Sequence, residues 1–274
     1  MFESLMHSDL DSPLSAAVAE RDKNTLQMVS DAIRKKQVLL AFQPIVQSAR
    51  PDTPAFWEGL IRVLDDSGRV IPAREFIHTA ETSEMGRILD SLALEFGLET
   101  LSENPDLRLS INMSARSIGY PRWMETLKRG VERDPTVGER LILEITEASA
   151  IVMPDLVTVF MQQQQDRGIS FALDDFGAGY TSFRYLRDFY FDMIKIDSSF
   201  IRGIAQSPDN QVITASLISL AQHFDMFTVA EFVETQEDAA YLVSAGIDCM
   251  QGHYFGAATI DPPWVRQATR KMAV

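Results

Sequence analysis

From Val38 onward, short apolar runs alternate with segments of helical periodicity. Within the runs, hydrophobic and polar side chains tend to alternate with the two-residue period of a β-strand. The intervening segments place apolar residues three and four positions apart, as amphipathic helices do. The pattern therefore predicts eight strands, most of them separated by helices. The expected strands are Val38–Val46, Ala55–Val63, Leu107–Met113, Arg140–Ile145, Ile169–Asp174, Phe191–Ile196, Met226–Val233 and Cys249–Phe255.

Strands joined through helices pair in parallel, because a crossover helix returns the chain to the same end of the sheet. Eight such units close a TIM-type barrel, so we predict an α/β fold of the TIM-like (β/α)8 class. Residues 48–54 contain two prolines and are expected to form a loop between the first two strands. No linker rich in Pro, Gly or Ser divides the chain, and residues 38–274 are therefore expected to form one barrel.

Residues 1–37 precede the first strand and carry a helical pattern. Leu26, Val29 and Ile33 fall on one helix face, and the basic run 34–36 favours a helix C-terminus. We predict an N-terminal helical lead-in over residues 1–37 that packs against the barrel. A role in pairing with a second chain is the alternative.

Polar residues recur late in the expected strands, at positions that face the inside of a closed barrel. In the run from 169 to 174, for example, Phe171 and Leu173 share one face of the strand, and Ala172 and Asp174 share the other. Functional residues of TIM-type barrels come from the carboxyl ends of several strands, so such positions should converge at one rim. A satisfied buried pair would explain one of them, but not seven in successive strands. They are Glu58, Asn112, Glu144, Asp174, Lys195, Glu231 and Gln251.

Several carboxylates at one rim repel one another unless cations neutralise them. Asp175 adds a carboxylate beside Asp174, and the glycines at 177 and 179 allow a sharp turn after the pair. Taken alone, this stretch also fits a solvated acidic turn. The four histidines are not paired at ligand spacing, which argues against zinc. We therefore expect Mg²⁺ or Mn²⁺, with two ions favoured over one by the number of acids.

The lysine at 195 either balances the charge of the acids or stabilises negative charge that develops on a phosphate. Acids that hold two metal ions, together with a lysine, suit phosphodiester hydrolysis.

Composition narrows the range of partners. The chain has 25 Lys and Arg against 39 Asp and Glu, a net charge of −14, which suits it poorly to grip polymeric nucleic acid. We see no apolar run of the roughly 18 residues that a membrane span needs. The single cysteine, Cys249, excludes an internal disulfide framework and fits a reducing cytoplasm. It lies in an apolar run and is expected to be a buried small hydrophobic residue.

Eight short motifs follow one another along the chain: Phe42-Gln-Pro-Ile-Val46, Glu58-Gly-Leu-Ile-Arg62, Ser110-Ile-Asn-Met-Ser114, Leu143-Glu-Ile-Thr-Glu147, Asp174-Asp-Phe-Gly-Ala-Gly-Tyr180, Ile194-Lys-Ile-Asp197, Ala230-Glu-Phe-Val-Glu234 and Gln251-Gly252. In order and content they resemble the motifs of EAL-domain cyclic di-GMP phosphodiesterases. The likeness covers about residues 38–265.

The resemblance implies a TIM-like barrel with an atypical, antiparallel first strand. It also implies Mg²⁺- or Mn²⁺-dependent cleavage of cyclic di-GMP to linear pGpG by a homodimer. It implies that one metal is held by Glu58, Asn112, Glu144 and Asp174, and a second metal by Asp174, Asp175 and Glu231. It assigns the alignment or deprotonation of water to Lys195 and Glu231, and the bracing of the loop after Asp175 to Glu147. It assigns contact with the dinucleotide to Gln43, Arg62, Glu234 and Gln251.

Two positions depart from the family pattern. Gly59 replaces the alanine of the Glu-Ala-Leu signature, and Ala178 stands where threonine is common. One alternative function is a catalytically silent receptor module that binds cyclic di-GMP without cutting it. Another is a partner-docking protein with a vestigial barrel. Silent members should lose metal ligands, and this chain keeps every one of them.

Overall fold

Eight strands close into a barrel in the computed structural model, which describes residues 13–178, 186–187 and 189–265. The first strand is antiparallel to both of its neighbours in the ring, and the other neighbouring pairs are parallel. The expected TIM-like barrel and its reversed first strand are therefore confirmed. The order around the ring is β1 (Val38–Gln47), β9 (Cys249–Gln251), β8 (Phe227–Ala230), β7 (Met193–Ile196), β6 (Ser170–Phe176), β5 (Leu141–Thr146), β4 (Leu109–Asn112) and β2 (Arg50–Leu64), with β2 paired back to β1.

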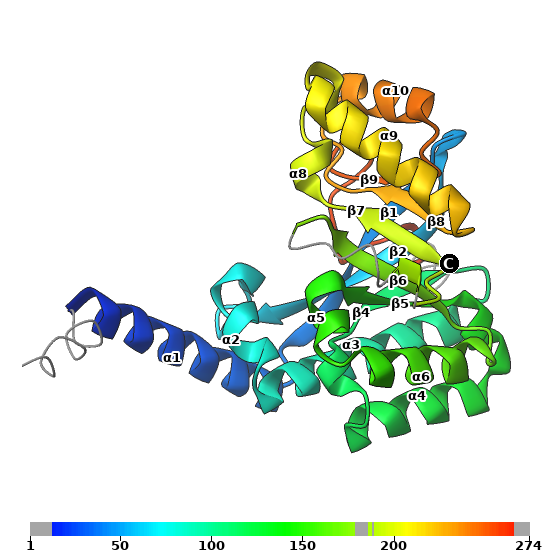
Figure 1. Ribbon diagram of the computed structural model, residues 1–274. Coiled ribbons are helices and arrows are strands. Elements are labelled where there is room, and N and C mark those ends of the chain that lie inside the picture. The colour runs from blue at the N-terminus through cyan, green and yellow to red at the C-terminus, as the bar shows by residue number, and fades with distance from the viewer. Residues whose placement is uncertain (1–12, 179–185, 188, 266–274) are drawn as a thin grey trace, which may run out of the picture.

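Helices cover the outside of this ring (Figure 1). Ser83, Ser207 and Thr235 cap three of them by accepting a hydrogen bond from an amide of the first turn. Besides α1 (Pro13–Arg34), the long helices are α3 (Glu84–Glu103), α4 (Pro121–Arg133), α6 (Pro154–Gln165), α9 (Pro208–His223) and α10 (Gln236–Ala245). The shorter pieces are the strand β3 (Val70–Ile71), which pairs with β2 outside the ring, and the helices α2 (Ile77–Glu81), α5 (Glu147–Val152) and α8 (Ser198–Ile201), with 3-10 turns at Ala73–Glu75, Ala115–Ser117, Pro135–Arg140 and Ile204–Gln206.

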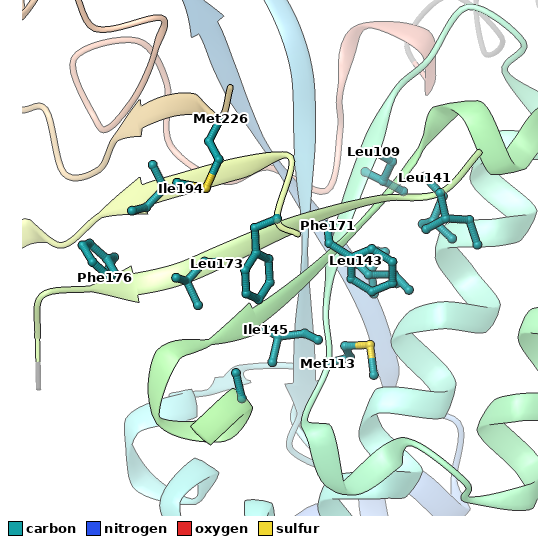
Figure 2. Close-up of a cluster of buried hydrophobic side chains, with 14 of the residues drawn as sticks. Leu109, Met113, Leu141, Leu143, Ile145, Phe171, Leu173, Phe176, Ile194 and Met226 are labelled. Carbon is teal, nitrogen blue, oxygen red and sulfur yellow. The ribbon is translucent and has the colours of Figure 1, made fainter. Parts of the chain in front are cut away.

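The strands bury apolar side chains on both faces. On the outer face, residues such as Leu143 and Phe171 pack in the layer between strands and helices (Figure 2). On the inner face, a smaller cluster joins strands that are not neighbours in the ring, so it fills the barrel interior. Its members are Ile45, Phe56, Ile142, Ala172 and Val229.

The inner cluster forms a floor beneath the polar residues that the two-residue alternation places on the inner face of the barrel. Glu144 comes two residues after Ile142, and Asp174 comes two residues after Ala172. Because side chains two apart in a strand point the same way, each acid stands one layer above an apolar residue. The floor keeps water away from below, and the acids face the open end of the barrel.

Most expected strand boundaries differ from the structure by no more than two residues, and three differ by more than that, for identifiable reasons. Residues 48–54 do not form a loop, because β1 and β2 join through a two-residue turn that leaves Gln47 opposite Arg50. The prolines that suggested a loop lie in β2 near register shifts, where a strand tolerates them. Strand β8 ends at Ala230, before the left-handed Phe232, whose φ is 55°. Strand β9 ends at Gln251, because the next residue, a glycine, approaches the backbone of the segment after β8.

The helix α1 (Pro13–Arg34) lies within the expected lead-in and extends away from the barrel (Figure 1). Its C-terminal half is anchored, because Val29 and Ala32 are buried in a cluster with Val63 and Phe76. The division of the chain at residue 37 stays a prediction. Among the helices that the structure describes, none combines the length and the apolar character needed to cross a bilayer.

Candidate active site

Lys195 is the hub of the residues that the barrel brings together. Its side chain is 1% exposed, and its Nζ lies 2.7 Å from Glu144 Oε2, 2.9 Å from Glu231 Oε1 and 3.0 Å from Asp174 Oδ1. Glu58 Oε2 is slightly farther away, at 3.7 Å. These five residues come from five strands or their ends, and one buried ammonium group therefore balances part of the charge of four carboxylates.

Two side-chain amides orient Glu58. Asn112 Nδ2 donates to Glu58 Oε1 at 2.8 Å, and Gln251 Nε2 donates to Glu58 Oε2 at 2.5 Å. Gln251 Nε2 also lies 3.3 Å from Gln43 Oε1, and Gln43 in turn donates to the carbonyl of Gly256 at 3.0 Å. The amides thus connect the first and last strands of the chain to the acids.

Burial sets the protonation behaviour of this cluster. It raises the pKa of Glu144 to about 8 and that of Glu231 well above its ordinary value, although Lys195 opposes both shifts. Burial alone would also raise the pKa of Glu58, but Lys195 and the two amides outweigh it, and the net shift is downward. Burial alone would lower the pKa of Lys195, yet the surrounding carboxylates raise it, so this lysine stays charged.

The side chain of Asp175 does not follow the inward and outward alternation of the strand. Its φ is 54°, in the left-handed region, and it lies where the pairing of β6 with β7 shifts register. Burial, and then repulsion by Asp174, raise the pKa of Asp175 to about 6. One oxygen of each of Asp174, Asp175 and Glu231 lies within 4.8 Å of the other two. These three acids are close enough to share a cation.

The donor set fits a hard divalent cation. The candidate ligands are carboxylate oxygens and the carbonyl oxygen of Asn112, which are the donors that Mg²⁺ and Mn²⁺ prefer. Among the described residues, Glu144 Oε1 is buried and has no hydrogen-bond partner. A buried acceptor in that condition is costly unless something else binds it.

Glu147 connects the site to the segment after β6. It is the first residue of α5, it is buried, and its Oε2 accepts the N–H of Gly177 at 3.3 Å. Gly177 has a φ of 99°, and a Cβ there would lie 2.3 Å from the ring of Phe200. Residues 179 and 180 of the expected glycine turn lie outside the described part of the chain.

A pocket of about 250 Å³ opens above the acids. Glu234 lines it together with Gln43, Glu58 and Gln251. Arg62 lies outside this lining. It is half-buried two residues beyond Leu60 on β2 and donates to the carbonyl of Ile61. Burial lowers the pKa of Arg62, while Glu58 opposes that shift.

Phe232 also lines the pocket, and the sequence reasoning missed it. It is 45% exposed and adopts a left-handed backbone, which is rare for a bulky residue. The Arg202 guanidinium lies 4.6 Å from the centre of its ring. The sequence signal was an aromatic residue between the acids Glu231 and Glu234, but it fell within the strand expected over Met226–Val233.

Gly59, the departure from the family signature, has a packing role here. A Cβ at Gly59 would lie 2.7 Å from Ile111 Cδ1, and one at Gly97 would lie 2.8 Å from the same atom. Ile111 therefore fits between two glycines on the outer face of the sheet, and Glu58 still points inward beside it.

The free thiol of Cys249 is half-buried below the site. Burial raises its pKa to about 11, which suits a packing role rather than a nucleophile.

Fold and site define a TIM-like barrel protein with an acidic, lysine-bridged centre at the carboxyl ends of its strands. Residues 26–258 match the EAL domain, and the chain belongs to the EAL domain family.

Two relatives share the same degree of identity with the chain. Cyclic di-GMP phosphodiesterase PdeB of Shewanella oneidensis is 31% identical over 232 residues, which are 83% of this chain and 27% of the relative. Cyclic di-GMP phosphodiesterase PdeF of Escherichia coli K12 is 31% identical over 235 residues, which are 84% of this chain and 31% of the relative. The chain thus spans less than a third of the length of these relatives.

A solved structure described as PaMucR phosphodiesterase in complex with c-di-GMP superimposes with a TM-score of 0.75. It is 26% identical in sequence, and the match covers 86% of this chain and 97% of that one. The barrel of this chain is therefore similar in fold to the barrel of that solved phosphodiesterase.

Proposed function

We propose that this chain hydrolyses cyclic di-GMP to linear pGpG with Mg²⁺ or Mn²⁺ as cofactor. The observation that carries the proposal is the convergence of four carboxylates on the buried ammonium of Lys195, with Asp175 adjacent. The names of the relatives supply the substrate, because PdeB and PdeF are both called cyclic di-GMP phosphodiesterases.

In this proposal the acids hold two ions. A divalent cation supplies positive charge to the phosphate oxygens and makes a bound water easier to deprotonate. Glu144 would offer its unpartnered buried oxygen to the first ion, and Asp174 would belong to both groups of ligands. The first group is Glu58, Asn112, Glu144 and Asp174, and the second is Asp174, Asp175 and Glu231.

The chemical step is attack of a water oxygen on a bridging phosphorus. Glu231 accepts the proton of this water, because its carboxylate lies beside Asp174 and Asp175, where the second ion would be held. Lys195 keeps its charge and stabilises the negative charge that develops on the phosphate. The bond between phosphorus and the 3′-oxygen breaks, the 3′-oxygen takes up a proton, and the ring opens to pGpG.

The pocket residues would orient the dinucleotide. Gln43, Gln251 and Glu234 offer amide and carboxylate groups for hydrogen bonds to it, and the exposed face of Phe232 is suited to stack on a nucleobase. Arg62 carries positive charge on β2, the strand that also bears Glu58, and would meet a phosphate just outside this lining. Glu147 would hold the segment at Gly177 so that Asp175 keeps its position.

The direct test is to incubate the pure protein with cyclic di-GMP and Mn²⁺ and to separate the products by chromatography. We expect pGpG with Mn²⁺ or Mg²⁺ and none when EDTA removes the metal. Glu231→Ala should abolish most turnover while leaving much of the nucleotide affinity. Tight binding without any pGpG at high enzyme concentration would instead identify a silent receptor.

We further propose that the chain works as a homodimer in the cytoplasm. Exposed apolar side chains on α5 and α6 support the first part: Val152, Leu156 and Val159 are 56%, 41% and 52% exposed. A single cysteine supports the second part. Analytical ultracentrifugation tests the dimer, and a stable monomer at micromolar concentration would contradict it.

A further inference from the structure

The turn that follows Asn112 is fixed on one side by an acid outside the acidic centre. Asp90 lies on α3, and its Oδ2 accepts two hydrogen bonds from this turn. The N–H of Ser114 donates to it at 2.9 Å, and the buried hydroxyl of Ser117 donates at 2.6 Å. One carboxylate oxygen therefore ties both ends of the segment from 114 to 117 to the helix.

A second side chain holds the same turn from the opposite side. Ser149, on α5, accepts the N–H of Ala115 through its Oγ at 2.8 Å, and this Oγ also lies 3.4 Å from the hydroxyl of Ser114. Ser149 is itself fixed, because its N–H donates to the Thr146 hydroxyl that caps α5. Two consecutive amides of the turn thus have side-chain acceptors on different helices.

The carboxylate at position 90 is costly for the fold. Burial raises the pKa of Asp90 to about 6, which means that its charged form is disfavoured there. The residue also faces a cavity of about 380 Å³ that Asn112 and Ser114 help to line. A neutral side chain at this position would avoid the free-energy penalty of burying a charge. The hydrogen bonds that the carboxylate accepts from the turn therefore explain why an acid is present.

Asn112 is the residue that gains from a rigid turn. It is the last residue of β4, and its amide must stay aimed at Glu58, 2.8 Å away. The strand pairing holds its backbone only up to Met113, whose N–H donates to the carbonyl of Glu144 at 2.9 Å. Beyond Met113, it is Asp90 and Ser149 that determine the course of the chain.

We propose that Asp90 and Ser149 are positioning residues that lock the turn 113–117 and thereby fix Asn112 in the metal-binding arrangement. The inference rests on the proposed function in one respect, namely that Asn112 is a metal ligand. Neither residue needs to touch the nucleotide. Their effect passes through the backbone of the turn.

The experiment compares Asp90→Ala with Asp90→Asn and, as a control, with Glu99→Ala, which removes an exposed acid from the same helix. Asparagine keeps an oxygen that can accept both hydrogen bonds, whereas alanine removes both. The first readout is Mn²⁺ affinity by titration calorimetry without nucleotide. The second is hydrogen–deuterium exchange of the 113–117 amides in EDTA-treated protein.

We expect Asp90→Ala to weaken Mn²⁺ binding by about 10–100-fold, the usual loss when a residue that orients a metal ligand is removed. Exchange at 113–117 should rise in parallel. Asp90→Asn and the control should match the unmodified protein in both readouts. Should Asp90→Ala fail to fold, Ser149→Ala tests the same turn from the other side, with the same expectation.

Two results would overturn the proposal. One is a lower melting temperature for Asp90→Ala with Mn²⁺ affinity and exchange unchanged, which would indicate a purely structural role. The other is a higher KM alone, which would place Asp90 in contact with the substrate. Because the metal titration needs no substrate, it gives a result even if the chain cleaves no cyclic di-GMP.

Discussion

The site has a buried centre and an exposed rim, and the two are built differently. The buried centre consists of Glu58, Glu144, Asp174, Lys195 and Glu231. All five side chains are nearly inaccessible, and four of them project inward from regular strands. Their charges are balanced mainly by one another, because the lysine lies within 3.7 Å of each acid.

The rim consists of Asp175, Phe232 and Glu234. These residues are exposed and lie beside or beyond the strand ends. Asp175 and Phe232 both have left-handed backbones, a conformation that costs an L-residue roughly 1–2 kcal/mol. Strain of this kind persists where the surrounding structure imposes it, often at functional sites. The comparison suggests that the centre supplies most of the cofactor's ligands, with Asp175 added from the rim, and that Phe232 and Glu234 adapt to the nucleotide.

The largest expected effect is the difference in Mn²⁺ affinity between a substitution in the buried centre and one in the rim. Asp174→Ala removes an acid that both groups of metal ligands share, and it leaves Lys195 with one acid fewer. We expect weaker Mn²⁺ binding by more than the roughly 10–100-fold that follows loss of an outer-shell partner, with nearly all turnover lost. Glu234→Ala, at the rim, should raise KM by only about 2–12-fold, the value of one hydrogen bond, at unchanged Mn²⁺ affinity. Equal effects of the two changes on Mn²⁺ affinity would contradict the division.

A smaller effect tests whether the strained backbone at Phe232 lowers the stability of the fold while its side chain strengthens nucleotide binding. Phe232→Gly relieves the left-handed strain but adds backbone freedom, so the free energy of unfolding should rise by about 0.5–1 kcal/mol. Loss of the stacking surface should weaken nucleotide binding by about 1–3 kcal/mol. Phe232→Tyr is the control and should change neither quantity much. Chemical denaturation and calorimetry measure the two quantities, and a destabilised glycine variant would show that the ring is needed for packing instead.

The smallest effect is a difference in pH dependence between the two parts, measured on EDTA-treated protein. The folded-state pKa of Glu144 is about 8, above its ordinary value, so its ionised form destabilises the fold fully above pH 8 and progressively less at lower pH. Glu144→Gln should therefore raise the melting temperature at pH 8 by a few degrees, since 1 kcal/mol corresponds to about 2–4 °C at this chain length.

Asp175→Asn provides the matched change at the rim. The pKa of Asp175 is about 6, so its destabilising contribution is complete above pH 6 and disappears toward pH 4. The stability difference between this variant and the unmodified protein should therefore be constant from pH 6 to 8, where that of Glu144→Gln still changes. Identical pH profiles for the two variants would show that these acids titrate as one group.

Most of the buried centre could be predicted from the sequence because strands impose a period of two. Glu144 and Asp174 stand two residues beyond buried apolar residues, so a count along each run selected the inward face. The same regularity predicted the eight strands and the barrel. The roles assigned to individual residues stay predictions.

The rim could not be predicted in the same way, because parity holds only while the backbone is extended. At Asp175 and Phe232 the backbone turns to positive φ, and the side chain no longer follows the alternation. The loop predicted over residues 48–54 was wrong for a related reason, since the prolines of this segment lie at an irregular part of β2 that a periodic pattern does not describe. The contact of Asp90 with Ser114 joins residues 24 positions apart, and no local pattern marks it.

The reversed first strand decides at which face the chain enters the barrel. Val38 begins β1 and lies opposite Val63, near the carboxyl end of β2, so α1 arrives on the same face as the ligand pocket. In a ring of parallel strands only, it would arrive beneath the apolar floor instead. Leu39 lies opposite Arg62 in the same ladder. A displacement of α1 can therefore be transmitted to Arg62, which is proposed to meet the substrate, through one pair of neighbouring strand residues. It does not have to pass from one end of the barrel to the other.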